Sequence, residues 1–213
     1  SRNSSVYGNS AKNFGGGISS NNTGIIEACS IENNSALRGG GVHSIKRLVN
    51  SVVANNSAEM GAAVYNFSEI LYATIANNAS QTYGSIYSNS GTIMASIIWG
   101  NTSANWQYPI FFQSAGDVLY SAVQGGWSGN GTFMIDSRNT DAYGPHFVEP
   151  TTVSGVSSQQ GNWSIEAASV CIDKSIFTQH IPSTDIEGSC RVIGENPDIG
   201  AYEQGVSAYD TLQ

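Results

Sequence analysis

The feature that most constrains this chain is a repeat of about 22 residues, which recurs four times between residues 14 and 101. Each repeat contains three aligned aliphatic positions, and the second and third of them are always five residues apart. The first positions are Ile18, Val42, Val64 and Ile86, the second are Ile26, Leu48, Ile70 and Ile93, and the third are Ile31, Val53, Ile75 and Ile98. An asparagine then follows in every repeat, as Asn34, Asn56, Asn78 and Asn101. A fixed period of this length is typical of a solenoid, in which each repeat buries its apolar face against its neighbours.

Short β-branched runs in each repeat are separated by Gly, Asn and Ser, which indicates strands and turns rather than helices. About 22 residues are enough for three short strands, so the sequence predicts an all-β parallel β-helix whose equivalent positions stack about 4.8 Å apart. The asparagines would then form a ladder of side-chain amides at a turn. Small residues would point inward where the coil is narrow, at Cys29, Ser51, Ala73 and Ser96. The glycine-rich runs suit a bend that needs small residues or positive φ.

The repeat divides the chain into coils at residues 14–37, 38–59, 60–81 and 82–104, preceded by the tail of a coil and followed by a looser one. We therefore assign residues 1–124 to β-helix coils, 125–203 to an irregular C-terminal cap of the same domain, and 204–213 to a tail or linker. Because the sequence begins inside a repeat, we expect further coils upstream.

Charged residues are only 11% of the chain, whereas about 25% is usual. The net charge of −8 is uneven, with +1 through residue 116 and −9 beyond it. Without a large basic patch, a nucleic-acid partner is not expected. The longest apolar runs are too short to span a membrane as a helix. These features predict a chain that binds neither nucleic acid nor the interior of a bilayer.

The three cysteines are too few for a disulfide framework. Cys29 occupies an inward position, so we expect a buried thiol there. For Cys171 and Cys190, pairing across the C-terminal segment and free thiols both remain open. The Asn-x-Ser/Thr sequons fall in the repeat, and we interpret them as ladder residues rather than glycan acceptors.

Four motifs of the acidic C-terminal region occur in a fixed order: Gly144 to Pro150, Ala168 to Asp173, Asp185 to Arg191, and Asp198 to Glu203. Together with the repeat phrase Asn50 to Ala58, they resemble right-handed β-helix proteins of the choice-of-anchor Q type, which are exported or cell-surface bacterial proteins common in Bacteroidetes. The resemblance covers nearly the whole chain, and Asp198 to Glu203 is its most specific part. It departs from the family pattern at Val170-Cys171, where proline followed by a small residue is frequent. The resemblance implies a right-handed coil and export, and it implies no particular activity.

Aromatic side chains are the candidate binding residues. The residue after the first aliphatic position should point outward, which would stack the rings of His43, Tyr65 and Tyr87, with Lys46 and Arg47 nearby. Such rings either stabilise the solenoid surface or contact the apolar faces of sugars. Irregular loops add a second candidate surface, with interior packing as the alternative. The predicted glycan platform is therefore His43, Tyr65, Tyr87, Trp106, Tyr108 and Trp127.

The sequence assigns no catalytic residue, cofactor or metal ligand. A polysaccharide lyase with this fold needs clustered carboxylates for Ca²⁺ and a basic residue, and a hydrolase needs a carboxylate pair on neighbouring coils. The acids of the coils share no column; they are Glu27, Glu32, Glu59 and Glu69. The acids of the C-terminal region are read as hydrogen-bonding groups that tie the cap to the last coil, with a bound cation as the alternative; they are Asp173, Asp185, Glu187, Asp198 and Glu203.

These observations predict a non-catalytic protein of the extracellular space or the bacterial cell surface, associated with the outer membrane. Its expected partners are polysaccharide or other surface components, either as a glycan-binding protein or as an accessory or adhesin part of a larger assembly. Two alternatives stay open: a lyase or glycoside hydrolase whose active site lies largely upstream, and a purely structural stalk.

Overall fold

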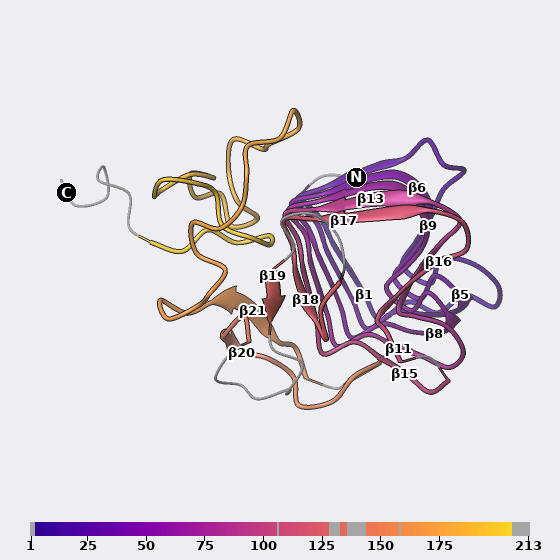
Figure 1. Ribbon diagram of the computed structural model, residues 1–213. Coiled ribbons are helices and arrows are strands. Elements are labelled where there is room, and N and C mark those ends of the chain that lie inside the picture. The colour runs from indigo at the N-terminus through magenta and orange to yellow at the C-terminus, as the bar shows by residue number, and fades with distance from the viewer. Residues whose placement is uncertain (1–2, 106, 128–132, 136–143, 158, 206–213) are drawn as a thin grey trace.

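The computed structural model describes residues 3–105, 107–127, 133–135, 144–157 and 159–205, and it is a parallel β-solenoid of about five turns (Figure 1). Three parallel sheets form its walls, and no helix occurs among the described residues. Accordingly, the described part of the chain contains no helix long and apolar enough to cross a membrane. The all-β solenoid predicted from the repeat is confirmed.

Each turn passes through the three sheets in the same order. Sheet I contains β2 (Ile18–Ser19), β3 (Ile25–Glu27), β6 (Val42–Val49), β9 (Val64–Leu71), β12 (Ile86–Ser88), β13 (Gly91–Met94), β16 (Ile110–Phe112) and β17 (Gly116–Leu119). Sheet II contains β1 (Ser5–Tyr7), β4 (Ser30–Glu32), β7 (Val52–Ala54), β10 (Thr74–Ala76), β14 (Ile97–Trp99), β18 (Ala122–Gln124) and β19 (Phe133–Ile135). Sheet III contains β5 (Ser35–Arg38), β8 (Ser57–Met60), β11 (Ala79–Ser80) and β15 (Thr102–Ser103).

The strand registers match the aligned positions of the repeat. Val53 of sheet II, for example, pairs with Ile31 on one side and Ile75 on the other, and Ile75 pairs in turn with Ile98. All four side chains are fully buried inside the coil. The series that begins at Ile18 extends in the same way to Ile110. The predicted stacking of equivalent aliphatic residues into one continuous core is confirmed.

The asparagine ladder runs along the turn between sheets II and III. The Nδ2 of Asn56 donates to Asn78 Oδ1 at 2.9 Å, and the Nδ2 of Asn34 donates to Asn56 Oδ1 at 3.1 Å. Each Oδ1 also accepts the backbone N–H of the asparagine one coil earlier, as Asn56 Oδ1 does from Asn34 N at 2.9 Å. The ladder continues to Asn101 at one end and to Asn9 at the other. These bonds satisfy polar groups that would otherwise be buried without partners.

Small residues occupy the predicted narrow positions. Cys29, Ser51, Ala73 and Ser96 are all fully buried. The Ser51 hydroxyl accepts the N–H of Cys29 at 3.1 Å and donates to the carbonyl of Val49 at 2.7 Å. At the bend before sheet I, Gly39 has φ of +67°, and a Cβ there would lie 2.4 Å from the carbonyl oxygen of Val42. A residue without a side chain is therefore required at that bend.

The C-terminal segment, from residue 144 to 205, lies beside sheet II and packs on its outer face (Figure 1). It contributes the antiparallel pair β20 (Phe147–Glu149) and β21 (Asn162–Ile165) and is otherwise irregular. Ala201 packs with Val52, Ala54 and Ala76, and Ile199 packs with Ile97 and Ala122. Hence the segment reaches across coils from β7 to β18. It covers the side of the solenoid, whereas the sequence reading tied it to the last coil.

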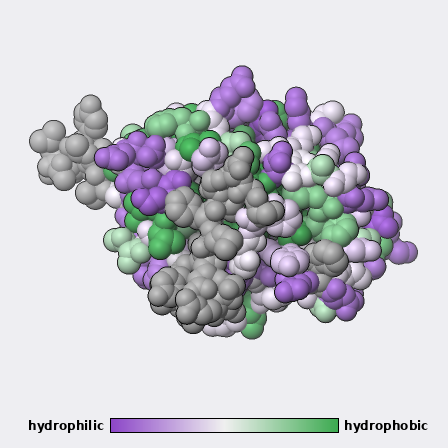
Figure 2. Space-filling view, in the orientation of Figure 1, coloured by the Kyte–Doolittle hydropathy of each residue, from purple (hydrophilic) through white to green (hydrophobic). Residues whose placement is uncertain are grey.

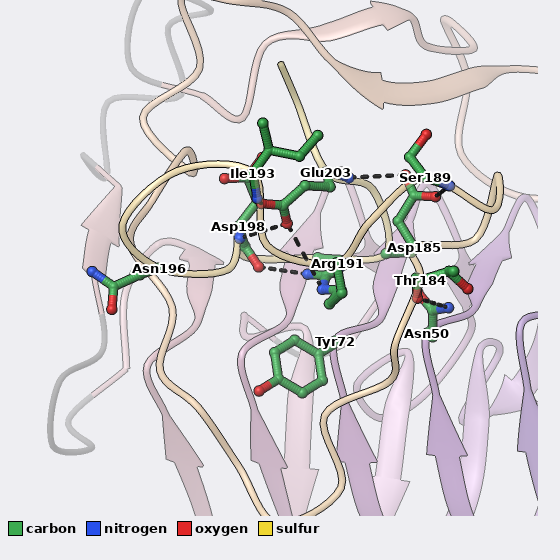
Figure 3. A network of polar contacts seen from close by, with 12 residues as sticks. Asn50, Tyr72, Thr184, Asp185, Ser189, Arg191, Ile193, Asn196, Asp198 and Glu203 are labelled. Carbon is green, nitrogen blue, oxygen red and sulfur yellow. Dashed lines mark hydrogen bonds and ion pairs between the residues drawn. The ribbon is translucent and has the colours of Figure 1, made fainter. Parts of the chain in front are cut away.

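The acids of this segment hold the segment itself together. Asp185 accepts backbone N–H groups of Glu187, Ser189 and Glu203 at 2.8–3.1 Å. Asp198 accepts those of Asp173 and Gln204, both at 2.7 Å. These bonds lie within the segment, so the expectation that the acids would bond to the last coil is wrong. The contacts with the coils come instead from other groups, such as Asn50 Nδ2, which donates to the carbonyl of Thr184 (Figure 3).

None of the three cysteines forms a disulfide. Cys29 and Cys171 are buried, and Cys190 is exposed. The pairing of Cys171 with Cys190 that the sequence left open is not present. Burial raises the pKa of the Cys171 thiol to about 12.

Candidate functional site

Aromatic rings form a stack on the outer surface of sheet I, which we call the aromatic stack. Strand pairing places His43, Tyr65, Tyr87 and Phe111 at equivalent positions of β6, β9, β12 and β16. The ring centroids are 5.4 Å apart for His43 and Tyr65, 4.8 Å for Tyr65 and Tyr87, and 5.2 Å for Tyr87 and Phe111. The planes of each pair are within 16° of parallel. Phe14 adds a tilted ring against His43.

This geometry determines which parts of the rings meet solvent. Parallel rings with centroids 4.8 Å apart cannot lie edge to edge in one plane, because their atoms would overlap, so they are stacked with an offset. The faces of Tyr65 and Tyr87 are thus turned toward neighbouring rings. Their edges and hydroxyl groups are left at the surface. The stack is therefore built to stabilise the coil, and ring faces become accessible only toward its ends.

The electrostatics of the stack follow from partial burial. Desolvation, helped by the charge of Arg38, lowers the pKa of His43, which favours the neutral imidazole. The guanidinium carbon of Arg38 lies 5.8 Å from the centroid of the Tyr65 ring, within the range of a cation–π contact. Desolvation also raises the pKa of Tyr87, and the neighbouring Tyr65 and Tyr83 hydroxyls raise it further. Both pKa shifts favour the uncharged forms of His43 and Tyr87.

A groove begins where the stack ends, and we call it the aromatic groove. Its volume is about 1020 Å³. Aromatic and polar side chains line it, namely Tyr108, Phe111, Phe112, Trp127, Thr92, Ser114 and Asp117. Phe111 belongs to both features, since it is the last ring of the stack and a wall of the groove. In Figure 2, hydrophobic residues are exposed near β16 at this end of the solenoid, between hydrophilic residues at the rim.

Two glycines that face each other in the strand register explain the shape of the groove. Gly91 pairs with Gly116, and both line the groove. A Cβ at Gly116 would lie 2.5 Å from the ring of Phe112, and one at Gly91 would lie 2.7 Å from the ring of Phe67. The missing side chains let these two rings lie across the bend of sheet I. Phe112 can then support Trp127, whose ring is 6.0 Å away in an edge-on arrangement.

The predicted site residues fall into two groups. His43, Tyr65 and Tyr87 are together in the aromatic stack, while Tyr108 and Trp127 are together in the aromatic groove. Trp106 lies outside the described residues. Tyr108 is 45% exposed, and Trp127 is partly buried against the core, so the groove combines an exposed wall with a packed one.

Two rings that matter here are absent from the sequence prediction, Phe111 and Tyr83. The signal for Phe111 was available, because it follows Ile110 as Tyr87 follows Ile86, but the longer loop before it obscured the alignment. Tyr83 contacts the rings of Tyr87 and Phe111 at 5.5 and 4.7 Å from outside the strand register. No repeat position marks it.

The chemistry offered by the groove is that of a binding surface. Apolar ring area lies beside the hydroxyl groups of Thr92 and Ser114 and the carboxylate of Asp117. The described part of the chain contains no group of three or more His, Cys, Asp or Glu residues placed to hold a metal ion. Comparison with protein-family models, with curated proteins and with solved structures finds no match.

Proposed function

We propose that this chain is a non-catalytic carbohydrate-binding β-solenoid, exported to the cell surface, where it binds polysaccharide or another surface component. The observation that carries the proposal is the aromatic groove. It places the rings of Tyr108, Phe111 and Trp127 around one concavity together with hydroxyl and carboxylate groups. Sugars have both apolar C–H faces and hydroxyl edges, so a site for them needs ring area and hydrogen-bonding groups side by side.

The rigid frame of the site supports the same proposal. Ile110, Val118 and Val123 at the base of the last turn are fully buried, and β16 is paired with β12 along its whole length. Groups on such a frame lose little conformational entropy when they bind, which favours recognition of a flexible polymer.

The proposal is tested with a panel of polysaccharides on the full chain, in which binding and the release of reducing or unsaturated ends are scored together. The test variant is Tyr108→Ala, which removes an exposed ring from the groove. Tyr7→Ala is the matched control, because Tyr7 is 42% exposed and lies on β1 in the first described coil. Binding without released ends, lost in Tyr108→Ala and kept in Tyr7→Ala, is the expected result. Released ends would instead assign a lyase or hydrolase, and a panel with no binding would overturn the proposal.

A further inference from the structure

A second pocket lies directly behind the aromatic groove, between the last coils and the C-terminal segment. Its volume is about 780 Å³. The coils contribute Trp99, Gln107 and Gln124, and the segment contributes His146 and Glu166. We call it the polar pocket.

The two cavities share a wall. Along residues 107–110, Tyr108 and Ile110 line the aromatic groove, whereas Gln107 and Pro109 line the polar pocket. This stretch bends at residues 107–109 before β16 begins, and its successive residues line opposite cavities. The partition between the cavities is only one stretch of chain thick.

Gly125 is a residue that the two cavities share. It lines both cavities, is exposed, and has φ of +82°. A Cβ built there would have no atom within 4 Å. At this shared residue the backbone therefore has open space beside it.

The charges of the two cavities have one sign. Among their described lining residues, the acidic ones are Asp117 in the aromatic groove and Glu166 in the polar pocket, and neither lining includes Lys or Arg. An acidic sugar would meet like charges in both cavities, and no Lys or Arg among the described lining residues would offset them. Sugars that carry no acidic group avoid this repulsion.

His146 lines the polar pocket, and hydrogen bonding holds its backbone in place. It has φ of +49°, an uncommon conformation for a residue other than glycine, and its carbonyl accepts the N–H of Glu166 at 2.8 Å. Here the antiparallel pairing of β20 and β21 begins next to His146.

From these observations we propose that the aromatic groove and the polar pocket are two subsites of one site, joined over Gly125, which binds an oligosaccharide chain of sugars without acidic groups. The inference rests on the proposed carbohydrate-binding function, and it adds the length and the charge class of the oligosaccharide ligand. A pocket of several hundred Å³ encloses one drug-sized ligand, and two connected pockets of this size suit a longer chain. A disaccharide occupies the aromatic groove alone, and a hexasaccharide extends into the polar pocket.

The experiment measures dissociation constants by calorimetry for cello-, manno-, xylo- and chito-oligosaccharides from disaccharide to hexasaccharide, with oligogalacturonates as the acidic series. Two variants address the connection and the second subsite: Gly125→Asn, which adds a side chain over the partition at a φ that asparagine tolerates, and His146→Asn, which removes the imidazole at a positive φ. Gly8→Asn is the matched control for the first, since Gly8 is exposed, has φ of +69° and has no atom within 4 Å of a built Cβ. His180→Asn is the control for the second.

We expect hexasaccharide affinity to exceed disaccharide affinity in the natural chain, and Gly125→Asn and His146→Asn to reduce hexasaccharide affinity about tenfold, which corresponds to the loss of about one net hydrogen bond. Disaccharide affinity should fall much less than hexasaccharide affinity in both variants, and both controls should behave as the natural chain. Equal effects on short and long oligosaccharides, or tighter binding of oligogalacturonates, would overturn the inference while leaving carbohydrate binding in place. Absence of binding for every probe, in the natural chain as well, would overturn the proposed function and with it this inference.

Discussion

The guanidinium carbon of Arg191 lies 4.8 Å from the centroid of the Tyr72 ring, so the most buried cation of the C-terminal segment rests on an aromatic ring of the solenoid (Figure 3). Arg191 is 1% exposed, and its Nη2 donates to the carbonyls of Asp198 and Gly200 at 2.6 and 2.8 Å. The Tyr72 hydroxyl in turn donates to the carbonyl of Ile176 at 2.7 Å. This contact joins the irregular segment to the regular coils, and it is where the stability of their association can be tested.

Replacing Arg191 by alanine should lower the free energy of unfolding by about 3–5 kcal/mol, because the buried carbonyls of Asp198 and Gly200 lose their donor and the Tyr72 ring loses its cation. Arg191→Lys should recover part of the loss, since it restores the charge but neither the planar stack on Tyr72 nor the fork of donors. Urea denaturation and limited proteolysis measure the effect. Lys174→Ala, at an exposed position of the same segment, serves as the control. Equal stability of Arg191→Ala and the natural chain would contradict this account.

Stability should also depend on pH through Glu203. Desolvation raises the pKa of this carboxyl from its ordinary 4.5 to about 7 in the folded chain. The folded state consequently binds a proton more tightly than the unfolded state, so the contribution of Glu203 is greatest below its unfolded pKa and declines as pH rises through about 7. Burial raises the pKa of Asp198 and Glu32 as well, which adds to the same trend.

Thermal unfolding followed at intervals between about pH 5 and 8, the window set by this linkage, should therefore give a melting temperature that falls with rising pH. In Glu203→Gln the fall should be shallower, because the glutamine does not titrate. Since the glutamine also replaces an acceptor of the Asp198 N–H, a lower melting temperature at every pH is expected in this variant. The slope is the diagnostic quantity, and an unchanged slope would show that Glu203 does not carry the effect.

The regular coils were predictable from the sequence because each position recurs in the same local environment. The three aliphatic columns, the inward small residues and the asparagine ladder all follow from one period and the spacing between strands.

The outer face of sheet II also carried a signal that the sequence prediction did not use. Val52 and Ala54 flank the inward Val53, and a strand with no polar residue on either face is one that is covered on both sides. This pattern indicates where the C-terminal segment packs.

The aromatic stack was predictable in position but not in orientation. The repeat places Tyr65 beside Tyr87, yet whether the rings share a plane or overlap depends on side-chain torsions that no period encodes. The aromatic groove was even harder to predict from the sequence, because Tyr108 and Trp127 come from loops outside the repeat. Trp127 packs edge-on against Phe112, whose position requires Gly116.

The asparagine ladder should contribute most at its centre. Asn56 is fully buried, and its side chain bonds Asn34, Asn78 and the carbonyl of Ile31. Asn56→Ala leaves several of these groups without partners, each at a cost of about 1–3 kcal/mol, so we expect the unfolding free energy to fall by about 3–5 kcal/mol. Asn9→Ala, at the exposed end of the ladder, should cost less than about 1 kcal/mol. Similar losses in the two variants, measured by urea denaturation, would mean that burial does not set the strength of the ladder.

Thiol reactivity provides an independent check on the packing of the segment. Cys190 is exposed, whereas Cys29 and Cys171 are fully buried, and the pKa of Cys171 is raised to about 12. A thiolate-specific reagent should therefore modify a single cysteine of the native chain rapidly and all three in denaturant. Mass spectrometry should locate the fast label at Cys190. Rapid native labelling of Cys171 would show that the segment opens from sheet II, and the absence of fast labelling would indicate that Cys190 is covered.

The last prediction separates the aromatic stack from the aromatic groove. Tyr65 lies between His43 and Tyr87, and Arg38 adds a cation–π contact, so Tyr65→Ala removes two ring pairs and should lower the unfolding free energy by about 1–3 kcal/mol. Because its ring faces are covered by neighbouring rings, the same change should leave carbohydrate affinity unaltered. Tyr65→Phe, which keeps the ring, should restore the stability. Urea denaturation and calorimetry on one preparation measure both quantities. A loss of affinity in folded Tyr65→Ala would show that the aromatic stack itself binds carbohydrate.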